Sequence, residues 1–381
     1  MSADRGSIDW PAVRAEFPAL DRWTFLNTAT FGQLPRRATE AVARHFERRD
    51  ALACWDFLSW FDDADRIRES IARLIGAAAD DIAFIPNTAA GLSVVVSGME
   101  WQPGDRIVTL AGEFPNYLYL PALVSRWGVE VIEAPWERFY QTIDQRTRLV
   151  ALSSVNYTNG FLVPLADIGR FLRDRGVPLF VDGTQSVGAL RFDVAESGCD
   201  ALAVHGYKWL LSPTGAGFLY LRRQLRDRLR PNVVGWRSHT GWRDVHDLHH
   251  GKPEFDESAQ KFEGAMLPFP ELYALGASVE MLLEIGTDQI ERRVLQLAGR
   301  TRALLAAAGG EVATGGAQIV AARFPRLDVP RLAQDLRDRG VLVSARHGNL
   351  RVSPHFYNNE QDLEKFAAAL RELLSNDCPD T

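Results

Sequence analysis

The sequence predicts an α/β protein. Between about Thr88 and Leu221, short runs rich in β-branched and apolar residues alternate with longer segments whose apolar residues recur at helical spacing. Several of the short runs are apolar at nearly every position, as expected of strands that are covered on both faces. Together these patterns are typical of a parallel sheet with helices on both sides.

The expected strands and helices alternate in the order that right-handed βαβ units require. The strands are predicted at Arg106–Leu110, Val129–Ala134, Arg148–Val155, Pro178–Val181, Ala201–His205 and Gly217–Leu221. Between them, Asn116–Trp127 and Leu165–Arg175 carry apolar residues at helical spacing. The second of these ends at Arg175-Gly176, which is a typical helix stop.

A second lobe is predicted after about Gly235, where a stretch rich in Trp, His and Asp leads into a helical pattern from Pro270 to Ala307. The remainder predicts strands at Ile319–Arg323, Val341–Ser344 and Leu350–Ser353, and helices at Val329–Arg339 and Glu360–Ser375. We therefore expect an N-terminal segment (residues 1–32), a large α/β domain (33–250) and a small α+β domain (251–381).

Composition excludes several classes of protein. The 381 residues are 46% hydrophobic and carry a net charge of −6, whereas a nucleic-acid surface needs clustered Lys and Arg. The basic run Arg222–Arg230 is diluted by acidic residues and is interpreted as a solvated helix face. Because Met1–Trp10 lacks the apolar core of a signal peptide, and no later run approaches the roughly 20 apolar residues of a membrane span, we expect a cytoplasmic protein.

Neither a disulfide framework nor a metal site is predicted. The three cysteines, Cys54, Cys199 and Cys378, lie far apart and outside any CxxC spacing. His246 and His249 could be interpreted as metal ligands at near-helical spacing, but no carboxylate-histidine pattern flanks them. We therefore expect no bound metal.

Two polar residues mark a candidate site. Asp182 follows the strand Pro178–Val181, at the carboxyl end where open parallel sheets bind ligands, although an Asp there is equally often a turn former. Lys208 follows the strand Ala201–His205 and, taken alone, is typical of a surface lysine. The pair together suits pyridoxal 5'-phosphate (PLP), because a lysine forms an imine with its aldehyde while an aspartate keeps its ring nitrogen protonated.

Four segments resemble the class V aminotransferase family, which includes cysteine desulfurases, kynureninase-like enzymes and isopenicillin-N-epimerase-like proteins. They are Leu26–Gly32, Phe180–Ala189, His205–Gly217 and Leu350–Asn358. The resemblance spans nearly the whole chain. It implies the PLP-dependent transferase fold of type I, with a mostly parallel seven-stranded sheet and a smaller α+β domain, and it implies PLP as the cofactor.

The resemblance also implies roles for individual residues. Lys208 matches the Schiff-base lysine, Asp182 the partner of the pyridinium nitrogen, and Gln185 a donor to the ring hydroxyl. Phe114 matches the residue that stacks on the pyridine ring. Arg351 matches the arginine that binds the substrate carboxylate through a bidentate fork, although a strand-edge arginine paired with a nearby acid is the alternative.

The remaining implied contacts concern the cofactor phosphate and ring. Thr88 and Ala89 match a phosphate loop at a helix N-terminus, and His205 and Tyr207 stand where relatives place phosphate donors. Relatives carry an Asn three residues before the glycine equivalent to Gly160. This chain has Tyr157 there, with Asn156 beside it, and Asn156 is taken as the candidate.

Several activities remain open at this stage. Desulfurases of the family carry a nucleophilic cysteine shortly before the arginine, where this chain has Arg346-His347-Gly348-Asn349, so a persulfide mechanism has no candidate thiol. We expect an aminotransferase that acts on an amino acid, with a PLP-dependent lyase or epimerase as the alternative. A non-catalytic PLP-binding protein is a further alternative, because Tyr157 and Met266 depart from the family pattern.

A homodimer is expected, because the active site of this fold usually lies at a subunit boundary. The stretch Trp236–His250, which appears exposed and aromatic from its sequence, is the candidate interface. A nucleotide-binding enzyme is not predicted, since no glycine-rich phosphate motif follows a strand.

Overall fold

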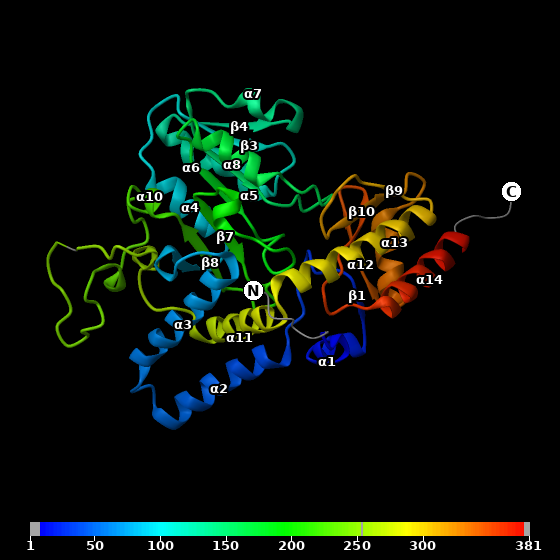
Figure 1. Ribbon diagram of the computed structural model, residues 1–381, viewed down its shortest axis with the longest axis horizontal. Coiled ribbons are helices and arrows are strands. Elements are labelled where there is room, and N and C mark those ends of the chain that lie inside the picture. Colours follow the sequence, from blue (N-terminus) through cyan, green and yellow to red (C-terminus); the bar gives the residue numbers. More distant parts are fainter. Residues whose placement is uncertain (1–7, 253, 377–381) are drawn as a thin grey trace, which may run out of the picture.

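The computed structural model describes residues 8–252 and 254–376. A large lobe and a small lobe lie side by side and are joined by one long helix (Figure 1). Cys378 and the first seven residues, on which part of the signal-peptide prediction rests, lie outside the described residues. None of the helices within the described ranges combines the length and apolar character that crossing a membrane requires.

The large lobe is built on a seven-stranded sheet with the order β2-β8-β7-β6-β5-β3-β4. Its strands are β2 (Ile82–Ile85), β3 (Arg106–Leu110), β4 (Glu130–Ala134), β5 (Thr147–Ser153), β6 (Leu179–Asp182), β7 (Ala201–His205) and β8 (Gly217–Leu221). Only β8 runs antiparallel to its neighbours β2 and β7, and the pairs from β7 to β4 are parallel. The predicted α/β class and mostly parallel sheet are confirmed.

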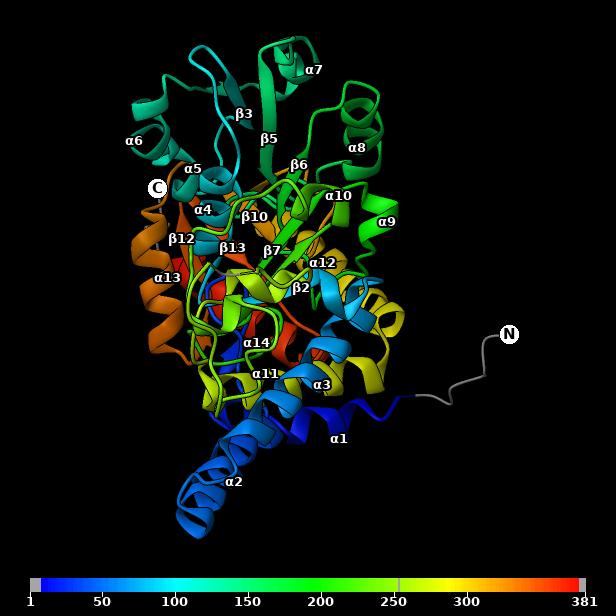
Figure 2. The ribbon, with the colours of Figure 1, turned by 90° about the vertical axis from the view of Figure 1, so that its left-hand side faces the viewer.

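Helices cover both faces of this sheet. They are α2 (Arg36–Leu52), α3 (Phe57–Ile75), α4 (Thr88–Gly98), α5 (Pro115–Leu118), α6 (Leu120–Val124), α7 (Phe139–Thr142), α8 (Leu165–Arg173), α9 (Val194–Ser197), α10 (Arg223–Arg226) and α11 (Phe269–Ile285). Successive strand residues alternate between two cores: Leu149 packs in the cluster that contains α4, and Val150 in the cluster that contains α8 and α11. The view in Figure 2 shows α2 projecting away from the sheet beyond α3.

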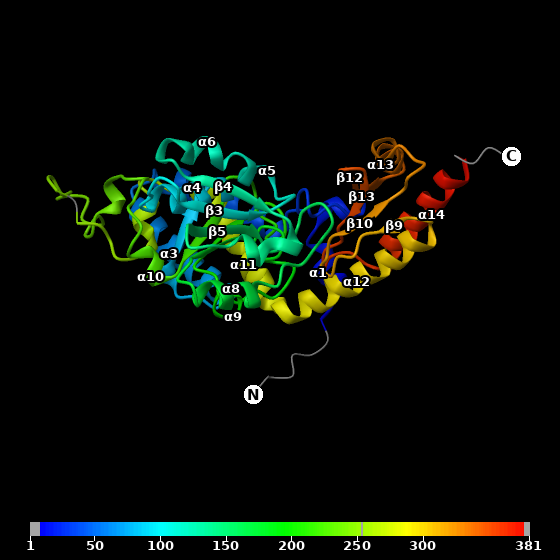
Figure 3. The same ribbon diagram turned by 90° about the horizontal axis from the view of Figure 1, so that it is seen from above.

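Two predicted helices are interrupted in the structure. The expected helix Asn116–Trp127 is divided into α5, α6 and a 3-10 turn, because Pro121 has no N–H to continue a helical ladder. The helical pattern from Pro270 to Ala307 is likewise two helices, α11 and α12 (Thr287–Ala307), separated by Gly286 with a φ of 93°. This break lets α11 pack against α2 and α3 while α12 continues to the small lobe (Figure 3).

The small lobe is a four-stranded antiparallel sheet, in the order β12-β13-β10-β9, covered by helices on one face. Its elements are β9 (Glu311–Val312), β10 (Val320–Arg323), α13 (Val329–Asp338), β12 (Ser344–Arg346), β13 (Asn349–Val352) and α14 (Glu360–Asn376). The expected strand Val341–Ser344 is divided, because β11 (Val341–Leu342) pairs instead with β1 (Thr24–Phe25). The N-terminal segment, with α1 (Trp10–Ala15), thus packs onto this lobe as well as the large one. The domain division at residue 250 stays a prediction, and we propose that the passage between lobes lies in α12.

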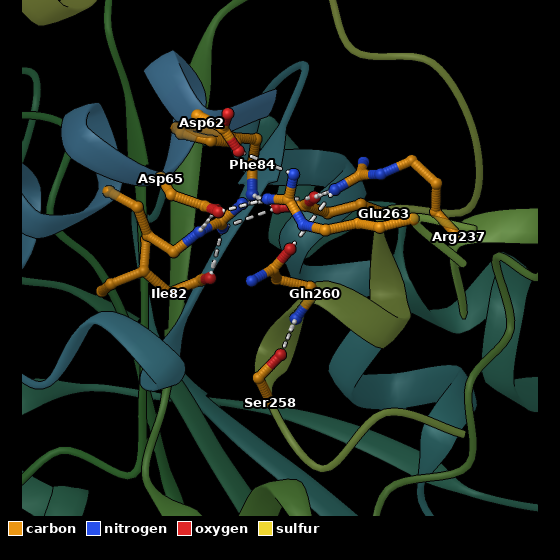
Figure 4. A network of polar contacts seen from close by, with 10 residues as sticks. Asp62, Asp65, Ile82, Phe84, Arg237, Ser258, Gln260 and Glu263 are labelled. Atoms are coloured by element: carbon orange, nitrogen blue, oxygen red, sulfur yellow. Dashed lines mark hydrogen bonds and ion pairs between the residues drawn. The ribbon is translucent and has the colours of Figure 1, made fainter. Parts of the chain in front are cut away.

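Residues 231–268 extend from the large lobe on the side away from the small lobe (Figure 1). A buried ionic network holds the two ends of this segment to the sheet (Figure 4). Glu263 accepts hydrogen bonds from Arg68 at 2.7 Å, Arg237 at 2.9 Å and the backbone N–H of Phe84 at 2.7 Å. Because all three charged side chains are buried, the carboxylate of Glu263 compensates the charges of Arg68 and Arg237 in a place that water does not reach.

Candidate active site

A cavity of about 310 Å³ lies at the carboxyl ends of β5, β6 and β7. These strands end at Ser153, Asp182 and His205, and because they run parallel their ends meet at one edge of the sheet. The lining consists of Asn87, Thr88, Ala89, Phe114, Asn116, Ser153, Tyr157, Asp182, Thr184, Gln185, His205, Tyr207 and Lys208. The structure therefore brings together most of the predicted site residues, and it does not bring Asn156 or Arg351 into this lining.

Lys208 is buried at the cavity wall, in the turn that follows β7. Burial lowers the pKa of its amine to about 8, an effect that the carboxylate of Asp182 opposes and the guanidinium groups of Arg351 and Arg346 reinforce. The turn is held by the N-terminal segment, since the N–H of Gly32 donates to the carbonyl of Tyr207 at 2.9 Å. A Cβ on Gly32 would lie 1.9 Å from the carbonyl oxygen of Lys208, so only glycine allows this approach.

Asp182 is the last residue of β6 and Gln185 lies on the turn that follows, and both line the cavity. One carboxylate oxygen of Asp182 accepts the backbone N–H of Thr184 at 2.9 Å. Burial raises the pKa of Asp182, and the hydrogen bonds from Thr184 and the charge of Lys208 act against that rise. The amide of Gln185 donates to the carbonyl of Ala29 at 3.1 Å and accepts from the indole of Trp209 at 2.8 Å, which leaves one amide hydrogen free to bind a ligand.

A second end of the cavity suits an anion. Asn87 caps α4 by accepting the N–H of Ala90 at 2.9 Å, so the helix N-terminus lies in the lining with Thr88 and Ala89. The Nδ1 atom of His205 is buried and has no hydrogen-bond partner among the described residues. Burial and the nearby charge of Lys208 lower the pKa of His205 to about 4, so its imidazole is neutral at physiological pH.

Phe114 and Tyr157 form the aromatic wall of the cavity. The Nζ atom of Lys208 lies 5.6 Å from the centroid of the Phe114 ring, and the Tyr157 ring meets that ring edge-on at 5.2 Å. Sequence reasoning selected Asn156 rather than Tyr157. In the structure the Asn156 carboxamide accepts the N–H of Thr158 at 2.9 Å and donates to the carbonyl of Gly112 at 3.0 Å, so it shapes the loop instead of facing the cavity.

Glu113 is a buried acid beside the cavity to which the sequence assigned no role. Its carboxylate accepts the N–H of Ser153 at 2.7 Å and the Ser153 hydroxyl at 2.5 Å. Burial raises the pKa of Glu113 to about 7 against the effect of these hydrogen bonds, and the charge of Asp182 adds to the rise. Its position next to Phe114, in the loop that follows β3, was the available signal.

Arg351 lies on β13 behind the cavity wall, and each of its three guanidinium nitrogens donates one hydrogen bond. Its Nε donates to the Ser344 hydroxyl at 3.1 Å, and its two terminal nitrogens donate to the Tyr157 carbonyl at 2.7 Å and the Thr30 hydroxyl at 2.6 Å. Among the described residues no carboxylate pairs with it. The predicted alternative, a strand-edge arginine paired with a nearby acid, therefore has no partner in the described part of the chain.

Comparison with known proteins identifies the family. The model of the aminotransferase class-V family matches residues 33–366. The chain belongs to the class-V aminotransferase family. It is 30% identical to isopenicillin N epimerase of Amycolatopsis lactamdurans, over 96% of this chain and 98% of that protein. It is 28% identical to an uncharacterized aminotransferase of Bacillus subtilis, over 92% and 94% of the two chains, and 26% identical to a probable cysteine desulfurase of Methanothermobacter thermautotrophicus, over 95% and 97%.

Solved structures agree on the fold. The cysteine desulfurase of Thermococcus onnurineus superposes with a TM-score of 0.87 at 23% identity, covering 99% of this chain and all of that one. A variant of the lyase C-DES, with glycine linked to its PLP cofactor, superposes with a TM-score of 0.86, covering 94% and 98%. The expected PLP-dependent fold of type I is confirmed, and this class-V family member is a PLP-dependent enzyme.

The residues of the cavity fit PLP on chemical grounds. The cofactor carries an anionic phosphate, an aldehyde and a basic ring nitrogen, and the cavity offers a helix N-terminus, a lysine and a buried carboxylate. The unpartnered His205 Nδ1 supplies a further polar atom at the anion end. Within the described residues, no group of three or more His, Cys, Asp and Glu side chains is arranged to hold a metal ion.

Proposed function

We propose that this family member is an aminotransferase that acts on an amino acid and holds PLP covalently through Lys208. The observation that carries the proposal is the placement of the Lys208 amine, with its lowered pKa, in the same cavity as Asp182 and the N-terminus of α4. A neutral amine is the form that attacks an aldehyde. When bound, PLP supplies a conjugated ring that accepts the electron pair left on the substrate after its Cα proton is removed.

The residues in and behind the cavity wall have separate roles in this reaction. Lys208 Nζ takes the proton from the substrate Cα, because Phe114 packs on the ring face and has no proton to exchange. The carboxylate of Asp182 holds a proton on the ring nitrogen, and the free amide hydrogen of Gln185 is donated to the ring hydroxyl. Arg351 orients the substrate by binding its α-carboxylate, for which each terminal nitrogen has a second N–H beside the one that it already donates.

The phosphate is bound at the other end of the cavity. The backbone N–H groups of Thr88 and Ala89 face it at the N-terminus of α4. The neutral imidazole of His205 and the hydroxyl of Tyr207 act as further donors. These groups would hold the cofactor in the cavity that Lys208 lines.

A lyase or epimerase is the second candidate, because the chain is 30% identical to an isopenicillin N epimerase over nearly its whole length. Epimerisation would differ in that the proton returns to the substrate Cα in place of the cofactor carbon, and it would also need a proton donor on the face of Cα opposite to Lys208. We do not propose a persulfide mechanism. Cys199 is buried in the large lobe, and burial raises the pKa of its thiol to about 12.

We further propose that the enzyme is a homodimer. The support is a set of exposed apolar side chains on the segment of residues 231–268, namely Val233, Val234, Leu248, Phe255 and Met266. A cytoplasmic location stays a prediction of the sequence.

The test is an absorbance spectrum of the purified protein between roughly 300 and 500 nm, with Lys208→Ala as the comparison. We expect a visible band that borohydride removes by reduction onto Lys208 and that the variant lacks. The holoenzyme is then mixed with amino acids and a keto acid, and the products are identified. Transfer of the amino group indicates an aminotransferase, inversion at Cα an epimerase, and loss of a side-chain group a lyase. A protein that stays colourless after PLP is added would sink the proposal.

A further inference from the structure

The two faces of the small-lobe sheet differ in chemistry. Val320, Ala322, Leu350 and Val352 pack in one apolar cluster with α12, α13 and α14. Since successive strand residues point to opposite faces, the residues between them face away from the helices. The register places Ser344 opposite Arg351 and Arg346 opposite Asn349 on that second face.

This second face abuts the cavity wall. The Arg351 guanidinium donates to the carbonyl of Tyr157, and the hydroxyl of the same tyrosine is hydrogen-bonded to His347 Nε2 at 2.8 Å. Tyr157 is itself a lining residue of the cavity. Arg346 therefore lies next to both residues that contact Tyr157. It precedes His347 in the chain, and it is a neighbour of Arg351 across the hairpin.

Arg346 is a second guanidinium close to Arg351. Because Ser344 is paired with Arg351, Arg346 is its diagonal neighbour on the same face, and such neighbours lie about 7–8 Å apart. Arg346 is half-buried, and its guanidinium donates a hydrogen bond to the carbonyl of the preceding residue, Ala345, at 2.7 Å. Among the described residues neither arginine has an acidic partner.

The charges around the cavity are unequal. Arg346 and Arg351 lie on the small-lobe side of the cavity, and Lys208 lies in its large-lobe wall. Their positive charges repel one another: besides burial, the charge of Arg346 lowers the pKa values of both Lys208 and Arg351. The acids nearby are Asp182, assigned to the ring nitrogen, and Glu113, which is bonded to Ser153. One substrate carboxylate satisfies Arg351 and leaves Arg346 unpaired.

We propose that Arg346 binds a second acidic group of the substrate, so that the enzyme acts on an α-amino acid whose side chain ends in a carboxylate. This inference rests on the proposed function and specifies its substrate class. The spacing of the two arginines suits a dicarboxylic amino acid, with the α-carboxylate on Arg351 and the distal carboxylate on Arg346. An apolar side chain in the same place would leave a guanidinium desolvated without a partner.

The experiment compares glutarate with pentanoate, which have the same number of carbons but differ in the second carboxylate. Each is titrated into the PLP-loaded protein by calorimetry. We expect glutarate to bind at least about tenfold more tightly than pentanoate, and Arg346→Gln to abolish this preference while leaving pentanoate affinity unchanged. The matched control is Arg323→Gln, because Arg323 is paired with Asn349 on the same face but lies two strands away from Arg346.

Two outcomes of the affinity measurements overturn the inference. One is equal affinity of the wild-type protein for glutarate and pentanoate. The other is equal loss in Arg346→Gln and Arg323→Gln, which would indicate a general effect of positive charge. The visible absorbance of the same samples separates this test from that of the proposed function. A protein that shows the Lys208-dependent band without a preference for the dicarboxylate contradicts only the substrate class. A loss of PLP affinity in Arg346→Gln would assign Arg346 to cofactor binding and would also overturn the inference.

Discussion

Glu113 is buried next to the cavity without a cationic partner among the described residues, and its carboxylate accepts hydrogen bonds from the N–H and hydroxyl of Ser153 and from the N–H of Phe114. Burial raises its pKa from 4.5 to about 7, so the folded protein favours the protonated acid more than the unfolded chain does. Stability is therefore fully present below the unfolded pKa and is lost as the pH rises from about 4.5 to about 7. The maximum loss is about 3 kcal/mol, because one pKa unit corresponds to about 1.4 kcal/mol.

We predict that Glu113→Gln removes this pH dependence. A glutamine cannot ionise, yet its carboxamide oxygen still accepts the backbone N–H of Ser153. Urea denaturation of both proteins between about pH 5 and pH 8 measures the effect, and the variant is expected to lose less free energy of unfolding over that range than the wild type. Glu364→Gln, a change at an exposed residue of α14, is the control. Parallel curves for Glu113→Gln and wild type would contradict the prediction.

At the residue scale, sequence motifs selected Lys208, Asp182, Thr88 and Ala89, which the structure places in one cavity, because each lies at the end of a strand, just after one, or at the start of a helix. Motifs were less informative on the loop at residues 156–160. Asn156 and Tyr157 are adjacent in the sequence. In the structure Tyr157 lines the cavity, whereas the side chain of Asn156 is hydrogen-bonded within its own loop. Which of the two side chains faces the cavity depends on the local hydrogen bonds of the Asn side chain, and these cannot be deduced from the composition of the loop.

At the scale of elements, the parallel strands were predicted within a few residues, because their apolar runs are bounded by turn residues on both sides. The strand β2 was missed. It has only four residues, and it joins the sheet at an edge beside β8, far from it in the chain. Its place depends on the buried Arg68–Glu263–Arg237 network, in which Glu263 accepts the N–H of Phe84 on β2.

We predict that Glu263→Gln lowers the free energy of unfolding by about 3–5 kcal/mol, because it removes the one carboxylate that binds both buried arginines and leaves Arg68 only its longer ion pair with Asp65 at 3.6 Å. Guanidinium denaturation followed by tryptophan fluorescence measures the change, since Trp236 and Trp242 lie on the segment that the network holds. Glu100→Gln is the matched control. Its ion pair with Arg230 is largely exposed, so its loss is expected to cost about 1 kcal/mol or less. Equal effects of the two substitutions would argue against the importance of the buried network.

At the scale of the whole molecule, the proposed homodimer is tested by sedimentation. We predict a species of twice the 42.5 kDa of one chain, and a shift toward the single-chain mass in Val234→Asp, because a carboxylate is costly to bury at an apolar interface. Leu162→Asp is the control, since Leu162 is similarly exposed but lies outside residues 231–268. A single-chain mass of the wild-type protein across the micromolar range would contradict the proposal.

The linear order of residues was enough to predict an α/β chain, a cofactor lysine with its aspartate and a family, because periodicity, strand ends and short motifs are local features. It did not determine where the helical run Pro270–Ala307 breaks, or that the β12–β13 hairpin presents Arg346 and Arg351 on one face toward Tyr157. The contact between Arg351 and Tyr157 joins residues that are 194 positions apart. Packing and strand register bring them together, and both exist only once the two lobes have folded against each other.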